Sequence, residues 1–442
     1  MKNNLAQNFN IISLLKFTAP TTIMLIFISM YSMVDGIFVS NIVGANALSA
    51  INIVYPIPSI FIAIAIMLAT GGSAIVAKNM GEGKQTEAKE NFSMIIAVGT
   101  IIGIVCAILG LIFIKPIIYA LGATEVLYQY CYDYLFILVL FCPLSMLQML
   151  FQTFFVTAGK PNLGLLLTII GGATNIILDY IFIVVLGMGV IGAAIGTTIG
   201  YCIPAIFGLI YFMVNRKGTL YFVKPKFRFK VFANTCLNGS SEMVTNLAIA
   251  VTTLMFNKIM LEFMGENGVA AITIVLYSQF LLTSIFMGFS GGVAPILSYN
   301  YGNKNNFQIK KLFKMSIGTV VILSFLMFAI AIVFAQPIIS VFTSRDSIIY
   351  DITYRGFILF AISYLFTGVN IFASSMFTAF SNGKVSAAIS FLRTFVFLII
   401  CLIVLPKAIG SDGIWLSVPV AEIISIIISI IFFVRYRKRY HY

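Results

Sequence analysis

Long runs of apolar residues recur along the whole chain and are separated by short polar segments. Each run has twenty or more residues, enough for a helix to cross a hydrocarbon core of about 30 Å. The pattern predicts twelve membrane-spanning helices, at residues 12–38, 49–77, 91–114, 128–157, 162–186, 190–214, 236–263, 269–299, 311–335, 350–380, 385–406 and 412–434.

Composition supports this fold class. Of the 442 residues, 60% are hydrophobic and only 9% are charged, whereas a soluble domain carries about 25% charged residues. The mean hydropathy is +1.06. The sequence therefore predicts an all-α polytopic membrane protein.

The distribution of basic residues predicts the orientation of the chain in the membrane. Of the 27 Lys and Arg residues, 21 lie at the termini or in the even-numbered connections between spans. By the positive-inside rule, both termini face the cytoplasm. The net charge of +13 then reflects orientation and contact with anionic membrane lipids, and no nucleic-acid partner is expected. No cleavable signal peptide is evident, because the first apolar run exceeds twenty residues and lacks a cleavage site.

The second half of the chain repeats the first. GGSAIVAKNMG at 71–81 corresponds to GGVAPILSYNYG at 291–302, at an offset that stays between 220 and 224 over more than a hundred residues. We therefore predict two six-helix lobes, at 1–214 and 236–442, joined by a basic cytoplasmic linker at 215–235. Because six is an even number, the lobes run parallel and a pseudo-twofold axis along the membrane normal relates them, as in secondary transporters with alternating access.

The sequence lacks the motifs of nucleotide binding, histidine-based catalysis and metal binding. GEGK at 81–84 does not have the spacing of a phosphate-binding loop, and the only histidine is His441. The six cysteines have no metal-binding spacing and are interpreted as core residues. We expect no catalytic residues and no cofactor, and a membrane-embedded enzyme, a structural protein and a channel are all disfavoured. Transport would draw its energy from an ion gradient or from the substrate's own gradient.

Two carboxylates in apolar spans are candidate functional groups, since such groups are costly in hydrocarbon. Asp35 lies 19 residues beyond Lys16, and Asp179 lies 19 residues beyond Lys160. At 1.5 Å per residue, both lie about 28 Å along their helices. Asn175 precedes Asp179 by one turn, and Thr197-Thr198 reach a similar depth. The alternatives are that Asp35 caps a helix end near Ser40-Asn41 and that Asn175 and Asp179 are a structural polar pair.

Such a cluster suits a proton or a sodium ion. Two nearby carboxylates cannot easily both ionise in a low dielectric, so one of them can take up and release a proton. The same oxygens of Asp35, Asn175 and Asp179 also suit a hard cation. Na⁺ is therefore the one metal ion that this sequence suggests, and the residues leave the choice between H⁺ and Na⁺ open.

Pro20, VDGIFVSNIVGANALSAINIVYP at 34–56, NIILD at 175–179 and the duplicated glycine-rich segments resemble the multidrug and toxic compound extrusion (MATE) family over the whole chain. The resemblance implies two six-helix lobes in a V that export cationic or amphipathic compounds in exchange for H⁺ or Na⁺. It also implies a cation site at Asp35, Asn175, Asp179 and Thr197, and a helix kink at Pro20.

Other polar residues in the spans are weaker candidates. Glu242 starts the second lobe and has either a coupling or substrate role or a gating or packing role. Arg393 and Glu422, in neighbouring apolar spans, predict a buried structural ion pair. Residues that would line a central substrate cavity, or else bond one helix to another, are Tyr31, Gln148, Gln152, Gln279 and Asn370, with Ser374 beside Asn370.

The function expected from these features is that of an inner-membrane antiporter, working as a monomer, for amphipathic or cationic small molecules. A lipid-linked oligosaccharide flippase of the same superfamily is the alternative. A flippase would favour a strongly basic cavity for pyrophosphate, and Arg393 is the only basic residue deep in the second lobe. The sequence therefore favours the antiporter.

Overall fold

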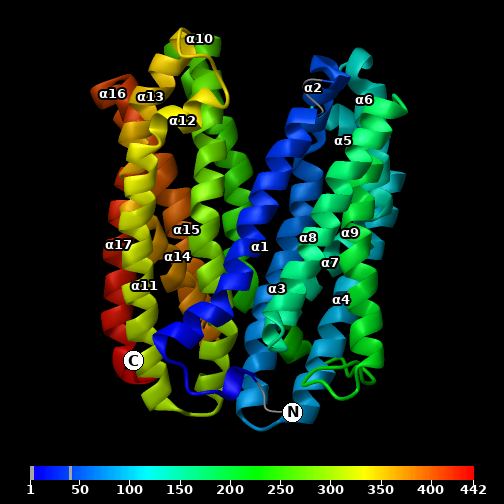
Figure 1. Ribbon diagram of the computed structural model, residues 1–442, viewed down its shortest axis with the longest axis vertical. Helices are drawn as coiled ribbons and strands as arrows, with labels where there is room; N and C mark the ends of the chain where they lie inside the picture. The colour runs from blue at the N-terminus through cyan, green and yellow to red at the C-terminus, as the bar shows by residue number, and fades with distance from the viewer. Residues whose placement is uncertain (1–3, 39–41) are drawn as a thin grey trace.

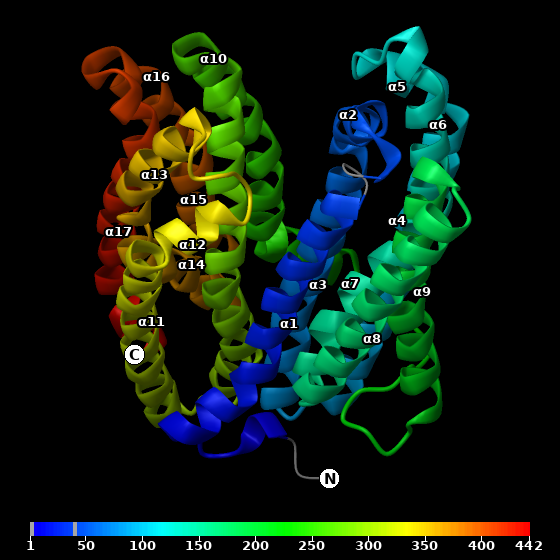
Figure 2. The same ribbon diagram turned by 45° about the horizontal axis from the view of Figure 1, so that its top comes forward.

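The computed structural model describes residues 4–38 and 42–442, without the side chains of residues 35–38 and 45. Every regular element in this part of the chain is a helix, and the helices form two bundles (Figure 1). We call α1–α9 the first lobe and α10–α17 the second lobe. The two views in Figures 1 and 2 show the lobes side by side, converging toward the end that carries both termini and diverging toward the other end.

The first lobe follows a short N-terminal turn, η1 (Asn4–Ala6). Its helices are α1 (Ile11–Phe38), α2 (Ala45–Val54), α3 (Pro56–Gly81), α4 (Gln85–Ile112), α5 (Ile114–Ala120), α6 (Glu125–Leu140), α7 (Cys142–Thr157), α8 (Pro161–Asp179), the π-helical turn η3 (Tyr180–Val185) and α9 (Gly189–Val214).

The second lobe begins with a long helix that turns back on itself. Its elements are α10 (Phe229–Gly302), α11 (Asn306–Val333), α12 (Ala335–Ser340), α13 (Ile348–Ala361), α14 (Tyr364–Ala379), α15 (Gly383–Phe391), the π-helical turn η4 (Leu392–Phe397), α16 (Leu398–Ile409) and α17 (Ser411–Tyr440).

These helices account for the twelve predicted crossings. Among the described residues, nine helices are long and apolar enough to cross a membrane, and two bent pairs, α6 with α7 and α13 with α14, add two more. One of the nine, α10, is 74 residues long and is broken at Gly265, whose φ of 65° and ψ of −156° favour glycine. Its two arms are two crossings, so the predicted all-α polytopic fold is confirmed.

Several predicted spans are not single α-helices, and π-helical turns interrupt those at 162–186 and 385–406. The span at 49–77 is divided between α2 and α3, because Pro56 has no backbone N–H and starts a new helix. The spans at 128–157 and 350–380 bend by 55° and 52°. The span at 236–263 begins earlier, at Phe229, because FKVFANT at 229–235, which was predicted to belong to the linker, continues the helix.

The two lobes share one core at the end where they converge and have separate cores at the other end. One cluster of buried side chains joins residues of both lobes, including Phe9, Phe92 and Phe289. A second cluster lies in the second lobe around Phe286 and Trp415, and a third lies in the first lobe around Leu135. The lobes are therefore held together mainly at the terminal end.

Glycines bring the backbones of the two lobes into contact there, and they do so reciprocally. A Cβ added at Gly81 of α3 would lie 2.0 Å from the carbonyl oxygen of Tyr299 in α10. A Cβ added at Gly302 of α10 would lie 2.1 Å from the carbonyl oxygen of Lys78 in α3. Both positions therefore require glycine, and the same contact occurs twice about the pseudo-twofold axis.

Two segments outside the spans also lie against the lobes at this end. Asn4 Nδ2 donates to the carbonyl of Gly159 in the first lobe at 2.9 Å, and Gln308 Nε2 of the second lobe donates to the carbonyl of Phe9 at 3.2 Å. The linker between α9 and α10 is held on α4 by Glu90. Its carboxylate lies 2.6 Å from Lys226 Nζ and 2.7 Å from Arg228 Nη2.

Candidate cation site and pocket in the first lobe

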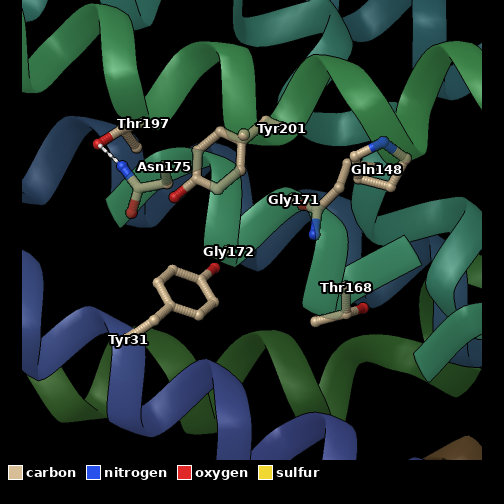
Figure 3. A pocket seen from close by; sticks show the side chains of 10 residues that line it. Tyr31, Gln148, Thr168, Gly171, Gly172, Asn175, Thr197 and Tyr201 are labelled. Carbon is tan, nitrogen blue, oxygen red and sulfur yellow. Dashed lines mark hydrogen bonds between the residues drawn. The ribbon is translucent and has the colours of Figure 1, made fainter. Parts of the chain in front are cut away.

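The candidate cation site lies between α8 and α9. Asp179 ends α8 and is fully buried, and Asn175, one turn before it, is 3% exposed. Asn175 Nδ2 donates to Asp179 Oδ2 at 3.1 Å. It also approaches Thr197 Oγ1 of α9 at 3.5 Å, as Figure 3 shows. The structure thus brings together three of the four residues predicted for this site.

The adjacent residue Thr198 does not take part, because its hydroxyl donates to the carbonyl of Ala194 in its own helix at 2.7 Å. Asp35 belongs to the last turn of α1, and its side chain lies outside the described residues. Pro20 lies inside α1, where it removes one N–H from the helix. The participation of Asp35 and a kink at Pro20 therefore stay predictions.

Sequence reasoning missed the glycines that make room for this site. A Cβ at Gly196 of α9 would lie 2.3 Å from Asp179 Oδ1. At the next turn, a Cβ at Gly171 of α8 would lie 2.6 Å from the carbonyl of Gly200 in α9. The signal was present in the sequence, since Gly192, Gly196 and Gly200 follow the small-residue spacing of closely packed membrane helices.

Just after Asp179 the helix widens into the π-helical turn η3. Such turns interrupt the regular hydrogen-bond ladder and are frequent at functional sites. Asp179 therefore occupies the junction between a regular helix and a π-helical turn. It is the only charged residue in α8 and α9, both of which the structure describes completely.

A small pocket of about 10 Å³, room for about one water molecule, adjoins the site, and Figure 3 shows the side chains that line it. Tyr31 reaches toward α8 from α1, and Tyr201 lies beside Asn175. A Cβ at Gly172 would lie 2.9 Å from the ring of Tyr31, so glycine there lets the aromatic ring approach. The lining residues are Tyr31, Gln148, Thr168, Gly171, Gly172, Asn175, Thr197, Gly200, Tyr201 and Pro204.

The two glutamines predicted to line a cavity have different surroundings. Gln148 lines this pocket, and among the described residues its buried Oε1 has no hydrogen-bond partner. Gln152, one turn along α7, donates to Thr168 Oγ1 at 3.0 Å. Gln148 is therefore the glutamine whose amide is available to a molecule in the pocket.

In the second lobe, the predicted ion pair has direct contact. Arg393 Nε lies 2.8 Å from Glu422 Oε1, with the side chains 14% and 6% exposed. Asn370 is fully buried and donates to Glu422 Oε2 at 2.7 Å. The amide of Asn370 is therefore already hydrogen-bonded to Glu422. Glu242 and Gln279 lie on separate arms of α10, and both are half-buried.

The chemistry that this first-lobe arrangement allows follows from its burial. A carboxylate in a low-dielectric interior is costly unless a proton or a cation neutralises it. The carboxylate of Asp179 and the hydroxyl of Thr197 are oxygen ligands of the kind that a hard cation prefers, and Asn175 faces both of them with its Nδ2. The site therefore suits reversible binding of a small cation beside a small, partly polar pocket.

The MatE family model matches the chain twice, at residues 20–181 and 242–403. The second match begins 222 residues after the first, in agreement with the offset of the sequence repeat. The two matches fall in the first and second lobes. The duplication is therefore visible in the family model as well as in the sequence.

Relatives and solved structures extend over nearly the whole chain. The multidrug export protein MepA of Staphylococcus haemolyticus is 25% identical over 417 residues, covering 93% of this chain and 90% of the relative. MepA of Staphylococcus aureus strain MRSA252 is 24% identical over 419 residues, with the same coverage.

Two solved structures have the same fold, and each covers 100% of this chain and 98% of its own. A MATE transporter in complex with MaL6 has a TM-score of 0.93 at 20% identity. An outward-facing multidrug resistance transporter of the MATE family has a TM-score of 0.92 at 21% identity. The chain is a multi-pass membrane protein that belongs to the MatE family, as the resemblance of its motifs implied.

Proposed function

We propose that this protein is a secondary active exporter of amphipathic, cationic compounds in exchange for H⁺ or Na⁺. The observation that carries the proposal is the buried Asn175–Asp179 pair, with Thr197 beside it, at the wall of a pocket. The names of the MepA relatives, which are multidrug export proteins, support the choice of substrate class.

In this proposal the cation binds at Asp35, Asn175, Asp179 and Thr197. Cation and exported compound favour different states of the lobes, and exchange requires such differential binding. The first lobe (α1–α9) and the second lobe (α10–α17) are the two moving units, and residues 215–228 link them. The protein works as a monomer in the inner membrane with both termini in the cytoplasm, which the basic residues near the termini and in the linker support.

The test is ethidium accumulation by everted membrane vesicles, driven separately by a pH gradient and by a Na⁺ gradient. We expect one gradient to drive accumulation in the wild type, and Asp35→Asn and Asp179→Asn to abolish it while ethidium still binds. The matched control is Asp133→Asn, since that carboxylate is bonded to Gln129 in an exposed part of α6. Full-rate exchange by both site variants would overturn the assigned site, and no accumulation by the wild type would overturn the function.

A further inference from the structure

A chain of hydrogen-bonded hydroxyls runs through the interior of the second lobe. Ser390 Oγ of α15 lies 2.9 Å from Ser374 Oγ of α14, which lies 2.9 Å from Ser386 Oγ. Ser386 Oγ lies 2.7 Å from Thr378 Oγ1, and Thr378 Oγ1 lies 3.3 Å from Ser241 Oγ of α10. All five side chains are at most 4% exposed.

Each of these hydroxyls can donate one hydrogen bond and accept others. In all four contacts either oxygen can be the donor. A chain with this property can reverse the direction of all its hydrogen bonds without moving an oxygen atom. Three of the hydroxyls also reach a backbone carbonyl of a neighbouring helix, Ser386 that of Ser374 at 2.8 Å, Ser374 that of Ser386 at 3.4 Å and Thr378 that of Asn238 at 3.4 Å. Ser425, in contrast, donates only to a carbonyl of its own helix.

Charged residues lie just beyond the end of the chain that is deeper in the lobe. Arg393 follows Ser390 by about one helical turn, and Asn370, which is bonded to Glu422, precedes Ser374 by one turn. At 1.5 Å per residue, Arg393 lies about 15 Å from the start of α15. This places the Arg393–Glu422 pair near the middle of the membrane.

The other end of the chain lies close to the connection between α14 and α15, where the charge pattern places the cytoplasm. Thr378 precedes that connection, and Asn238 Nδ2 donates to its carbonyl at 2.9 Å. Asn238 Oδ1 is buried and, among the described residues, has no hydrogen-bond partner. A buried acceptor of this kind suits an ordered water. Two titratable groups lie near this end: Lys384 in the first turn of α15, and Glu242, one turn beyond Asn238 on the same face of α10. Glu242 is also within electrostatic range of Arg393.

The first lobe has only the beginning of such a chain. At the repeat offset of 222 residues, Gln152 and Thr168 correspond to Ser374 and Ser390, and they are hydrogen-bonded at 3.0 Å. The positions that correspond to Ser386 and Thr378 are Gly164 and Val156, which have no hydroxyl. The continuous chain is therefore specific to the second lobe.

We propose that the hydroxyl chain from Ser390 to Ser241 is a proton pathway between the cytoplasm and the Arg393–Glu422 pair at the middle of the second lobe. A proton that enters one end binds the first hydroxyl oxygen, and each hydroxyl passes its own hydrogen to the next oxygen. One proton leaves at the far end, every oxygen keeps a hydrogen, and no charge is left behind. Rotation of the hydroxyls then restores the chain. The inference rests on the proposed exchange and assigns it a proton rather than Na⁺.

The test uses purified protein in liposomes that contain a pH-sensitive dye, with proton movement started by ethidium. We expect Ser386→Ala to slow proton movement on the order of tenfold and to increase its solvent deuterium isotope effect, with unchanged ethidium affinity. Ser386→Thr restores the hydroxyl and should restore most of the rate. The matched control is Ser425→Ala, since this hydroxyl is 2% exposed and donates only to the carbonyl of Ala421. Melting temperatures identify a variant that fails to fold.

The outcomes separate the pathway from the exporter function. A wild-type rate and isotope effect in Ser386→Ala would overturn the pathway, and so would export driven by Na⁺ alone, while the exporter function would stand in both cases. If the wild type exports nothing, the exporter function is wrong. The pathway is then tested by measuring proton uptake into the liposomes, driven by a potassium–valinomycin potential. Uptake lost in Ser386→Ala would then support it, and equal uptake in both would overturn it.

Discussion

Gln148 lines a pocket in the first lobe, whereas Asn370, its counterpart at an offset of 222 residues, donates a hydrogen bond to Glu422. Gly171, which also lines the pocket, corresponds to Arg393 in the same way. An ion pair therefore occupies the place in the second lobe that is a pocket in the first. The duplicated halves share a fold but differ in chemistry at equivalent positions.

Removing one member of the Arg393–Glu422 ion pair should destabilise the protein more than removing both. Arg393→Met leaves the Glu422 carboxylate buried without its cation, which should destabilise the protein by about 3–5 kcal/mol. Arg393→Met with Glu422→Leu removes both charges and should cost much less. Thermal unfolding in detergent measures both. The exposed pair of Arg355 and Asp412, at 2.6 Å, is the control, and its loss should cost at most about 1 kcal/mol. Equal costs for the single and double variants would contradict a coupled pair.

Gly196 should be required for the cation site. Gly196→Ala places a methyl group where the carboxylate of Asp179 now lies, since a Cβ there would be 2.3 Å from Oδ1. Overpacking of this kind costs about 1–3 kcal/mol, so ethidium transport driven by the coupling ion should fall on the order of tenfold. Gly318→Ala in α11 is the control, because its Cβ would meet nothing within 4 Å. A wild-type transport rate in Gly196→Ala would contradict the prediction, because the carboxylate of Asp179 would then be able to move away from the added methyl group.

The contact between the lobes should respond equally to a change on either side of the pseudo-twofold axis. Gly81→Ala and Gly302→Ala each put a methyl group against a backbone carbonyl of the other lobe. Both variants should loosen the lobes at the terminal end and speed maleimide labelling of a single cysteine at Thr235, which is fully buried beside Gly71. Gly291→Ala meets nothing within 4 Å and should leave labelling unchanged. A response to only one of the two variants would argue against equivalent contacts.

The linker should separate from the first lobe when Glu90 loses its charge. Glu90→Gln removes the partner of both Lys226 and Arg228. The amide of Val223, which donates to Ser93 Oγ at 3.0 Å, should then exchange its hydrogen faster in hydrogen–deuterium exchange. Glu87→Gln is the control, since its carboxylate is 45% exposed and 3.9 Å from Arg228. Unchanged protection of Val223 in Glu90→Gln would mean that the aromatic contacts of Phe222 with Phe92 hold the linker by themselves.

The sequence allowed the fold class, the crossings and the duplication to be predicted, because hydropathy reports directly on which segments cross a membrane. It could not reveal the bends at Phe141 and Ser363 or the short helices α5 and α12. These depend on how the spans pack, and only the first bend is next to a proline, Pro143.

The candidate site was predicted less completely than the fold. Depth along a helix placed Asp35, Asp179 and Thr197-Thr198 at a similar level, with Asn175 one turn away, but depth does not give rotation about the helix axis. Thr197 and Thr198 therefore looked equivalent, although only Thr197 approaches Asn175. The hydroxyl chain was missed for the same reason, because helices that are apolar on every side do not indicate which serines face one another.

The reciprocal glycine contacts have a consequence for the origin of this chain. Gly81 against Tyr299 and Gly302 against Lys78 are one contact made twice, as in a homodimer whose subunits meet through identical surfaces. An ancestor encoded by a gene half as long could have paired with itself through this surface before the gene was duplicated. Fusion then freed each copy to change alone, so that equivalent positions now line a small pocket in one half and carry charges and hydroxyls in the other. On this account, the equivalent glycine contacts were inherited from the ancestor, and the differences between the lobe interiors arose after the duplication.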